Sequence, residues 1–287
     1  MTAIPPANWY PDPSGVGELR YWDGATWTQG VVIAGQVTEH PMPWPPVAAR
    51  QAAPPDERPQ LPGRAAFYGL AGFVAGLAGG VLLAIALASA DLPDIAVLLL
   101  NSAVLWGGLL AGCWLASRRY GTGNLRRDFG MEVTRRDAGW GVLMAVAAKI
   151  AGAIAIIPLV GNERLIGSNQ GVFGEVDSNV GTFLIFATVA VVGAPIAEEL
   201  FFRGLLLRSL TSVVGTAGAI AITSVLFGLA HFSPLLGLAN VSVVMVTAAG
   251  GVIFGITAWW RRRVGASVVA HASYNLISVI GAAFLLF

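Results

Sequence analysis

Two adjacent glutamates and an arginine interrupt a strongly apolar stretch of the chain. The stretch APIAEELFFRGLLL, residues 194–207, places Glu198, Glu199 and Arg203 among alanine, leucine and phenylalanine. An ionised side chain in hydrocarbon is costly unless it is paired or hydrated. These three residues are therefore the first candidates for a functional site.

Helical spacing predicts different surroundings for the two glutamates. Glu199 and Arg203 are four residues apart with the acid first, which favours an ion pair along one helix face. Successive residues of a helix point about 100° apart, so Glu198 faces elsewhere. We expect Glu199 to be compensated by Arg203 and Glu198 to be free. A purely structural role for the Glu199–Arg203 pair stays open.

Two of the three histidines also lie in apolar runs, in FGLAHF and VVAHASYN. His231 follows Phe227 by four residues and Asn275 follows His271 by four, so each pair shares a helix face. A carboxylate can act as a general base on water, a histidine can orient or share the proton, and histidine with asparagine can stabilise an oxyanion. That chemistry is hydrolysis of an acyl bond. Taken alone, His231 could be a core histidine, Asn275 a helix-packing residue and Phe227 a packing residue.

The composition places these residues in a membrane. Of 287 residues, 55% are hydrophobic and 11% charged, with a mean hydropathy of +0.70, whereas soluble proteins average about 25% charged residues. The net charge of +1 gives no indication of a nucleic-acid partner. We expect an all-α polytopic membrane protein of about seven helices. The apolar runs of spanning length are about 65–90, 95–117, 138–160, 180–210, 214–234, 237–259 and 265–287.

Arginine clusters predict the orientation of these helices, because cytoplasmic loops carry an excess of Lys and Arg. With seven helices and a cytosolic N terminus, the clusters fall on one side: Arg118, Arg119, Arg126, Arg127, Arg135, Arg136, Arg203, Arg208, Arg261, Arg262 and Arg263. The C terminus at Phe287 is then external, in a multi-pass protein of the cell membrane. Lys149 lies inside the third run without an obvious partner. Snorkelling or a cavity-facing pair is expected there rather than catalysis.

The first residues predict a small β-type module. The start MTAIPPANWYPDPSG has no basic and apolar signal-peptide pattern, so we expect these residues to be retained and cytosolic. Residues 1–35 alternate aromatic and polar side chains around the turn signals PDPSG and WDGATW, which predicts two or three strands with Trp9, Trp22 and Trp27 as the core. The stretch 7–32 resembles a short module of unknown function found on many actinobacterial membrane proteins. An aromatic ligand surface and a cytosolic partner for the module stay open.

A proline-rich segment separates the module from the membrane helices. Residues 41–62 hold eight of the sixteen prolines, a composition that excludes helix and favours an extended tether. We therefore expect a linker at 36–63 and a membrane domain at 64–287.

Three motifs on successive apolar runs resemble those of the CPBP intramembrane protease family, which includes the CAAX-processing endopeptidases and bacteriocin-processing proteins. EELFFR matches EExxxR, FGLAH matches FxxxH and HASYN matches HxxxN, and the similarity covers roughly residues 64–287. The resemblance implies a helical bundle around an intramembrane catalytic chamber reached from the cytosol. It also implies a role for each motif residue: Glu198 as the catalytic glutamate, Glu199 as its partner held by Arg203, His231 in water activation, and His271 with Asn275 as the oxyanion site.

The expected activity is metal-independent hydrolysis of a peptide bond by a CAAX-type glutamic endopeptidase, without a cofactor. The chain has no HExxH, and two histidines with a glutamate on scattered helices are a weak zinc signature. The expected substrate is a peptide or membrane-protein tail from the cytosolic face, since nothing indicates a prenylated cysteine. Two alternatives stay open: a proton-coupled transporter that uses Glu198, although no internal repeat is evident, and a catalytically silent scaffold or immunity protein.

Overall fold

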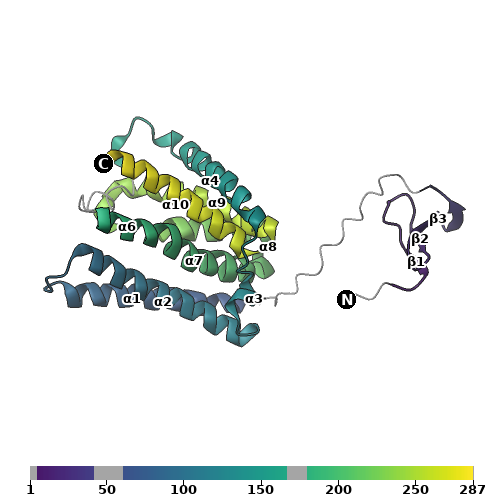
Figure 1. The fold of residues 1–287 in the computed structure, drawn as a ribbon, viewed down its shortest axis with the longest axis horizontal. Coiled ribbons are helices and arrows are strands. Elements are labelled where there is room, and N and C mark those ends of the chain that lie inside the picture. Colours follow the sequence, from purple (N-terminus) through teal and green to yellow (C-terminus); the bar gives the residue numbers. More distant parts are fainter. Residues whose placement is uncertain (1–4, 42–60, 167–179, 287) are drawn as a thin grey trace. The chain divides into compact units, whose positions relative to one another are not determined.

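The chain divides into two compact units, Met1–Glu57 and Arg58–Phe287. The first contains a small β-sheet and the second a bundle of helices (Figure 1). The computed structural model describes residues 5–41, 61–166 and 180–286.

Four short strands form one antiparallel sheet in chain order: β1 (Asn8–Pro11), β2 (Leu19–Trp22), β3 (Trp27–Ile33) and β4 (Gln36–Glu39). The sheet thus has one strand more than expected, and β4 lies in the segment that the sequence assigned to the linker. The additional strand forms because Ala34 and Gly35 make a two-residue turn, both with positive φ, 50° and 75°. Positive φ at both central residues matches the twist of a hairpin, so β4 folds back onto β3.

The centre of the module is a buried ion pair. Arg20 and Val31 have no exposed surface. The Arg20 Nε donates to Asp12 Oδ1 at 2.8 Å, and its Nη1 donates to the carbonyl oxygens of Thr28 and His40 at 3.0 and 2.9 Å. A single guanidinium therefore connects the loop after β1, the strand β3 and the residue that follows β4.

The tryptophans expected to form this core lie on opposite faces of the sheet instead. Tyr21 and Trp22 are neighbours in β2, so their side chains point to opposite faces. Trp9 packs on Tyr21 and Trp22 packs on Trp27, each pair with ring centroids 5.3 Å apart. All four rings remain partly exposed.

The second unit is an all-α membrane fold. Six helices of the described residues are long and apolar enough to cross a membrane: Gly63–Leu87, Asp94–Tyr120, Arg135–Leu159, Val180–Leu229, Leu236–Arg261 and Val264–Phe284. The sequence predicted seven, and the difference lies in the fourth span, whose 50 residues combine the runs 180–210 and 214–234. Gly215 has φ 73° and ψ 170°, so the helix is broken there, close to the predicted boundary.

The spans are built from α-helices, with short 3₁₀ and π segments. The α-helices are α1 (Ala66–Leu87), α2 (Asp94–Tyr120), α3 (Leu125–Phe129), α4 (Arg135–Ala155), α6 (Val180–Thr188), α7 (Ala194–Glu199), α8 (Leu207–Leu229), α9 (Asn240–Arg261) and α10 (Val264–Leu286). The π segments are η4 (Val189–Gly193) and η5 (Leu200–Leu206). The 3₁₀ segments are η1 (Gly63–Ala65), η2 (Ile157–Leu159), η3 (Glu163–Leu165) and η6 (Pro234–Ala239).

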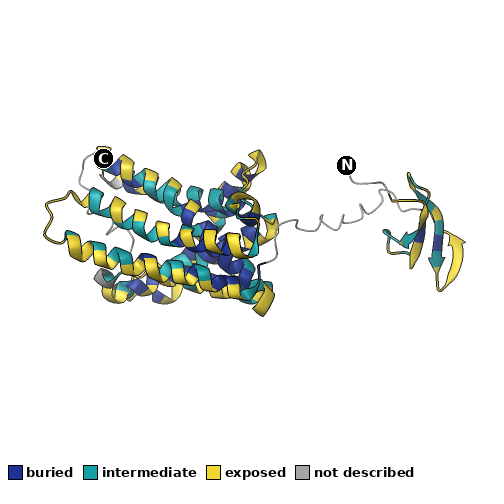
Figure 2. Ribbon diagram, turned by 90° about the horizontal axis from the view of Figure 1, so that it is seen from below, coloured by how far each residue is buried: buried dark blue, intermediate teal, exposed yellow. Residues whose placement is uncertain are grey.

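Both the surface and the helix contacts suit a lipid environment. Large apolar side chains of α1 are well exposed, among them Val74 at 62% and Ile85 at 67%. Between α1 and α2, Gly72 meets the backbone of Gly108 and Gly112, the close approach that small residues allow in membranes. Figure 2 shows exposed and intermediate residues along the helices of the bundle, with the buried residues gathered between them.

A short segment between the second and third spans packs against the helix that bears the glutamates. Phe129, at the end of α3, has no exposed surface. It lies against Gly204, where an added Cβ would be 3.1 Å from the Phe129 Cβ. The N–H of Val264, the first residue of α10, donates to the Gly130 carbonyl at 3.1 Å. The start of α10 is therefore fixed beside the middle of the fourth span rather than at its end.

Candidate intramembrane active site

The two glutamates lie on a six-residue α-helix between two π-helical segments, η4 and η5. In a π-helix each N–H bonds to the carbonyl five residues earlier, and such segments are frequent at functional sites. The N–H of Ala194 donates to the Val189 carbonyl, and the N–H of Leu207 donates to the Phe202 carbonyl. The direction of side chains on this span therefore departs from the 3.6-residue spacing assumed from the sequence.

Glu199 is the centre of a buried charged cluster. Its Oε1 accepts a hydrogen bond from Arg203 Nη1 at 2.8 Å and one from His271 Nδ1 at 3.0 Å. Glu199 has no exposed surface, Arg203 is 1% exposed and His271 is 3% exposed. The ion pair expected from the spacing is present, and it gains a histidine from α10. This contact also means that Nδ1 of His271 carries the hydrogen.

Glu198 has different surroundings from its neighbour. Within the described residues it makes no hydrogen bond or ion pair, and its Oε2 is buried. Oε2 of Glu199 is likewise buried without a partner. Buried carboxylate oxygens are normally hydrogen-bonded, so these two atoms need a further donor, and water is the simplest. The structure thus presents one carboxylate that is compensated by a cation and one that is not.

Aromatic rings surround the guanidinium of Arg203. Its Cζ lies 4.5 Å from the ring centroid of Phe227 and 5.5 Å from that of Phe254. Phe254 also stacks on His271, with centroids 4.8 Å apart and planes 18° apart. Cation–π attraction stabilises a desolvated guanidinium. The rings therefore hold both groups that bind Glu199.

The backbone of α9 supplies the other partner of Arg203. Its Nη2 donates to the Gly251 carbonyl at 2.9 Å. A Cβ added at Gly251 would lie 3.3 Å from this nitrogen and 3.2 Å from Ser224 Cα. A side chain at residue 251 would thus force the guanidinium or α8 to move.

His231 lies near the cluster without joining its hydrogen bonds. Its Nδ1 donates to the Phe227 carbonyl at 2.8 Å, one helical turn earlier, which leaves Nε2 for another partner. The Phe227 ring contacts both histidines, with centroids 4.8 Å from His231 and 5.5 Å from His271. Phe227 is therefore a packing residue, as expected, and it spaces the two imidazoles.

Asn275 makes a contact that the motif did not indicate. Its Nδ2 donates to the Ala190 carbonyl at 2.7 Å. In the π pattern of η4 this carbonyl would bond to the N–H of residue 195, but that residue is Pro195, which has none. Asn275 thus replaces a missing backbone donor and ties α10 to the helix bearing the glutamates. Its second amide hydrogen remains available for another acceptor.

The structure therefore brings Glu199, Arg203 and His271 into direct contact, with Glu198 and Asn275 on the same helices. His231 lies in the turn after α8, although the sequence placed it within a span. Three residues beyond the predicted set take part: Phe254, Gly251 and Ala190. None of them had a sequence signal: in an α-helix Pro195 would free the Val191 carbonyl, and only π bonding leaves the Ala190 carbonyl without a donor. In the described part of the chain no group of three histidine, cysteine or acidic residues has a metal-binding arrangement.

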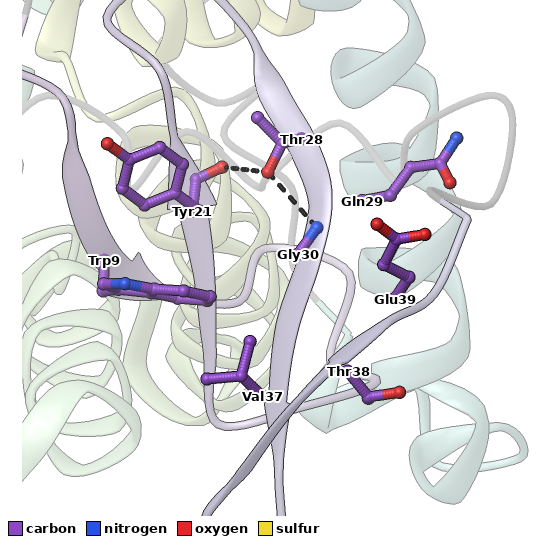
Figure 3. Close-up of a pocket in the computed structure, with 8 residues that line it drawn as sticks. All are labelled: Trp9, Tyr21, Thr28, Gln29, Gly30, Val37, Thr38 and Glu39. Carbon is purple, nitrogen blue, oxygen red and sulfur yellow. Dashed lines mark hydrogen bonds between the residues drawn. The ribbon is translucent and has the colours of Figure 1, made fainter.

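The N-terminal module carries a hollow of about 510 Å³. Its floor includes Gly30, over which the Trp9 indole extends, with Cη2 3.5 Å from the position of an added Cβ. The Thr28 Oγ1 donates to the Tyr21 carbonyl at 3.1 Å and accepts from the Gly30 N–H at 3.2 Å (Figure 3). The lining combines rings with one acidic residue, and its main members are Trp9, Tyr21, Thr28, Gly30, Val37 and Glu39.

Comparison with known proteins connects both units to families. No curated protein and no solved structure matches the chain. Residues 7–56 match the family described as protein of unknown function (DUF2510). Residues 180–277, which include all six predicted site residues, match the family described as type II CAAX prenyl endopeptidase Rce1-like. The helices that carry the candidate site are thus similar to the Rce1-like CAAX prenyl endopeptidases, which supports a multi-pass membrane protein with a CAAX-type protease domain.

Proposed function

We propose that the helical unit is an intramembrane endopeptidase in which Glu198 activates water for hydrolysis of a peptide bond. The observation that carries the proposal is the difference between the two glutamates. Glu199 is bound by Arg203 and His271, whereas Glu198 has no hydrogen-bond or ion-pair partner among the described residues. A carboxylate that is not neutralised by a cation is the better general base.

In this mechanism Glu198 removes a proton from water while the water oxygen attacks the carbonyl carbon of the substrate. Negative charge develops on the carbonyl oxygen, where His271 and Asn275 are the proposed donors. His271 would donate from Nε2, which requires hydrogen on both ring nitrogens, since Nδ1 already donates to Glu199. Glu198 then returns the proton to the amine as the carbon–nitrogen bond breaks. His231 orients the water, and the scheme needs neither a metal nor a cofactor.

The proposed orientation places the N-terminal module in the cytosol and the end of α10 outside the cell membrane. Contacts at the start of α4 support the proposal that α4 and the end of α9 share one arginine-rich end of the bundle. Asp137 pairs with Arg263 at 2.6 Å and with Arg261 at 3.4 Å. Beside them, Trp140 and Trp260 are partly exposed and in edge contact, as tryptophans often are at a membrane interface. We therefore propose that substrate, a peptide or membrane-protein tail, enters from this end.

Cleavage of a peptide library by the purified full-length protein tests the function. We expect the wild-type protein to cleave and Glu198→Gln to be inactive at an unchanged melting temperature. Glu132→Gln, which removes an exposed carboxylate outside the site, is the matched control and should retain activity. Cleavage should persist in EDTA, since the scheme uses no metal.

The other two functions give different results in the same preparation. A proton-coupled transporter would show flux in liposomes that depends on Glu198 and no peptide products. A silent scaffold would show neither activity. Either result would remove the protease proposal, and loss of cleavage in EDTA with rescue by zinc would replace the glutamate mechanism by a metal-dependent one.

A further inference from the structure

The hollow on the N-terminal module lies over one row of residues that crosses all four strands. Trp9 of β1 and Tyr21 of β2 are register partners, and so are Gly30 of β3 and Glu39 of β4. Directly opposite residues of an antiparallel pair lie side by side on one face of the sheet. A Cβ added at Gly30 would lie 3.5 Å from Trp9 Cη2 and 3.8 Å from Tyr21 Cβ, so the two halves of the row meet there.

Gly30 is the reason that this face is hollowed. The other three members of the row have large side chains, and two strand spacings, about 10 Å, separate the backbone of β2 from that of β4. A glycine between them leaves the space above β3 unfilled, and the hollow has a volume of about 510 Å³. Figure 3 shows the rings of Trp9 and Tyr21 on one side of Gly30 and the Glu39 carboxylate on the other.

The fold of the module does not use the Glu39 carboxylate. Residues 5–41 contain four carboxylates and a single arginine, Arg20. Asp12 pairs with Arg20, and Asp23 accepts backbone N–H groups in a turn. Glu39 is exposed and has no ion-pair partner among the residues that the structure describes. It therefore places an uncompensated negative charge beside an aromatic hollow, in a module that is acidic as a whole.

Aromatic rings and a carboxylate around one space are the surroundings that bind an organic cation. The face of a tryptophan or tyrosine ring attracts an ammonium or guanidinium group through the ring quadrupole. A carboxylate adds a charge-assisted hydrogen bond, which is frequently bidentate with arginine. The chemistry of the hollow is thus that of a site for a lysine or arginine side chain.

We propose that this hollow binds a lysine or arginine side chain in the cytosolic tail of the substrate, an inference that rests on the proposed protease function. Cytoplasmic segments beside membrane spans carry an excess of lysine and arginine, so a membrane-protein tail presents such side chains on the cytosolic side. The acidic module and a basic tail are complementary in charge. Because the module and the helical unit belong to one chain, capture of the tail raises its effective concentration for the helical unit.

Binding of a neutral peptide is the main competing explanation, since proline-rich segments also dock in aromatic-lined grooves. A neutral peptide would pack on Trp9 and Tyr21 and would not need the Glu39 carboxylate. Its binding would therefore be insensitive to Glu39→Gln and to salt. A bound cation loses its partner in the same variant and is weakened when salt screens the charges.

The binding test uses full-length Glu198→Gln protein in neutral detergent, so that no peptide is consumed, and fluorescence anisotropy of a labelled decapeptide of alanine and serine with three arginines. Replacement of the arginines by citrulline, which is neutral and similar in shape, should weaken binding about tenfold or more, the effect of a charged hydrogen bond. Glu39→Gln in this background should weaken binding of the arginine peptide equally. Glu18→Gln, an exposed carboxylate of the same module, is the matched control and should leave binding unchanged.

A second variant blocks the hollow without removing a ligand group. Gly30→Val introduces a β-branched residue, which strands favour, at a position where an added Cβ makes only ordinary contacts. We expect it to lose the arginine peptide while hydrogen exchange of residues 8–39 stays as in the parent protein. Equal binding of the arginine and citrulline peptides, or arginine binding that survives both Glu39→Gln and Gly30→Val, overturns the cation site and leaves the protease function standing.

Cleavage by the wild-type protein then tests whether the substrate supplies the cation. A peptide that the protein cleaves is compared with and without the arginine-rich decapeptide as an extension. The extension should lower KM about tenfold with kcat unchanged, and Glu39→Gln should remove this difference. An unchanged KM overturns the substrate as the source of the cation. No cleavage of any peptide overturns the protease function and the substrate with it, whereas the anisotropy measurement still decides the cation site.

Discussion

Glu198 and Glu199 are adjacent and chemically identical, and only their partners distinguish them. Glu199 accepts hydrogen bonds from a guanidinium and an imidazole, so its charge is part of a buried cluster. Glu198 makes no such contact within the described residues. Removal of the Glu198 carboxylate should therefore have a different physical consequence from removal of the Glu199 carboxylate.

We expect Glu198→Gln to lower turnover about 10²–10⁴-fold while leaving the melting temperature unchanged, because glutamine keeps the shape and removes the base. Glu199→Gln should lower both, since a buried guanidinium that loses its partner destabilises a protein by about 3–5 kcal/mol. Peptide turnover and thermal unfolding of the two variants check this. Exchanged phenotypes would reverse the assignment, and near-normal turnover in a folded Glu198→Gln protein would contradict the mechanism.

Asn275 combines a structural contact with a proposed catalytic one. Asn275→Ala leaves the Ala190 carbonyl without a donor, a loss of about 1–3 kcal/mol for a buried group. We expect a lower melting temperature together with reduced turnover. Pro195→Ala in the same background restores a backbone N–H near this carbonyl and should recover stability but not turnover. If Asn275→Ala loses turnover at an unchanged melting temperature, its contact with Ala190 does not stabilise the fold, and only the oxyanion role stands.

At the scale of elements, the site depends on how the fourth and the last span are aligned. Phe129 packs on Gly204, and the N–H of Val264 bonds to Gly130, so one short segment sets the levels of both the fourth and the last span. This contact adds to the direct hydrogen bonds of His271 with Glu199 and of Asn275 with Ala190. The segment after α3 is therefore part of the scaffold of the site.

Phe129→Ala tests this alignment. Truncation of a fully buried phenylalanine costs about 3–5 kcal/mol and removes the support beneath Gly204. We expect a lower melting temperature and, at temperatures where the protein remains folded, reduced turnover. Val133→Ala, a truncation at a residue 61% exposed, is the control and should change neither. Normal turnover in folded Phe129→Ala protein would show that the site is aligned by other contacts.

The sequence predicted those elements whose cause is local. Spans are readable because lipid demands about 20 apolar residues, and the pairing of Glu199 with Arg203 followed from four-residue spacing. The π segments were not predicted, since the interpretation of the sequence assumed 3.6-residue spacing throughout this span. The sequence predicted seven spans rather than six because the fourth span is broken at Gly215 but does not end there. The buried Arg20 was missed because an aromatic core was expected, whereas the sheet surrounds an ion pair.

The orientation of the whole molecule in the membrane can be tested without any assay of activity. The structure has six spans, and the fourth is broken at Gly215. The seven apolar runs of the sequence therefore still predict a cytosolic N terminus and an external C terminus. Reporter fusions at residues 60 and 287 should report opposite sides. If both report the same side, Val180–Leu229 crosses once as a single span, and substrate entry must be reassigned.

Because the chain forms two compact units, the module and the helical unit should respond separately to acid. Burial acts to raise the pKa of Asp12, but its contacts with Arg20, Ser14 and the Gly17 amide hold that pKa well below its ordinary value. A carboxyl whose pKa is lowered by folding stabilises the fold above its unfolded pKa, about 3.9, and loses this contribution as pH falls toward the folded value.

We therefore expect the module to lose protection against hydrogen exchange as pH falls below about 4, measured on peptides from residues 8–39 of the full chain and corrected for intrinsic rates. Asp12→Asn should weaken protection at neutral pH and remove most of the acid dependence, because the Arg20 pair is already lost. Glu18→Gln, an exposed carboxylate of the same module, should behave as the wild type. Equal acid dependence in Asp12→Asn and wild type would mean that the buried ion pair does not hold the sheet together.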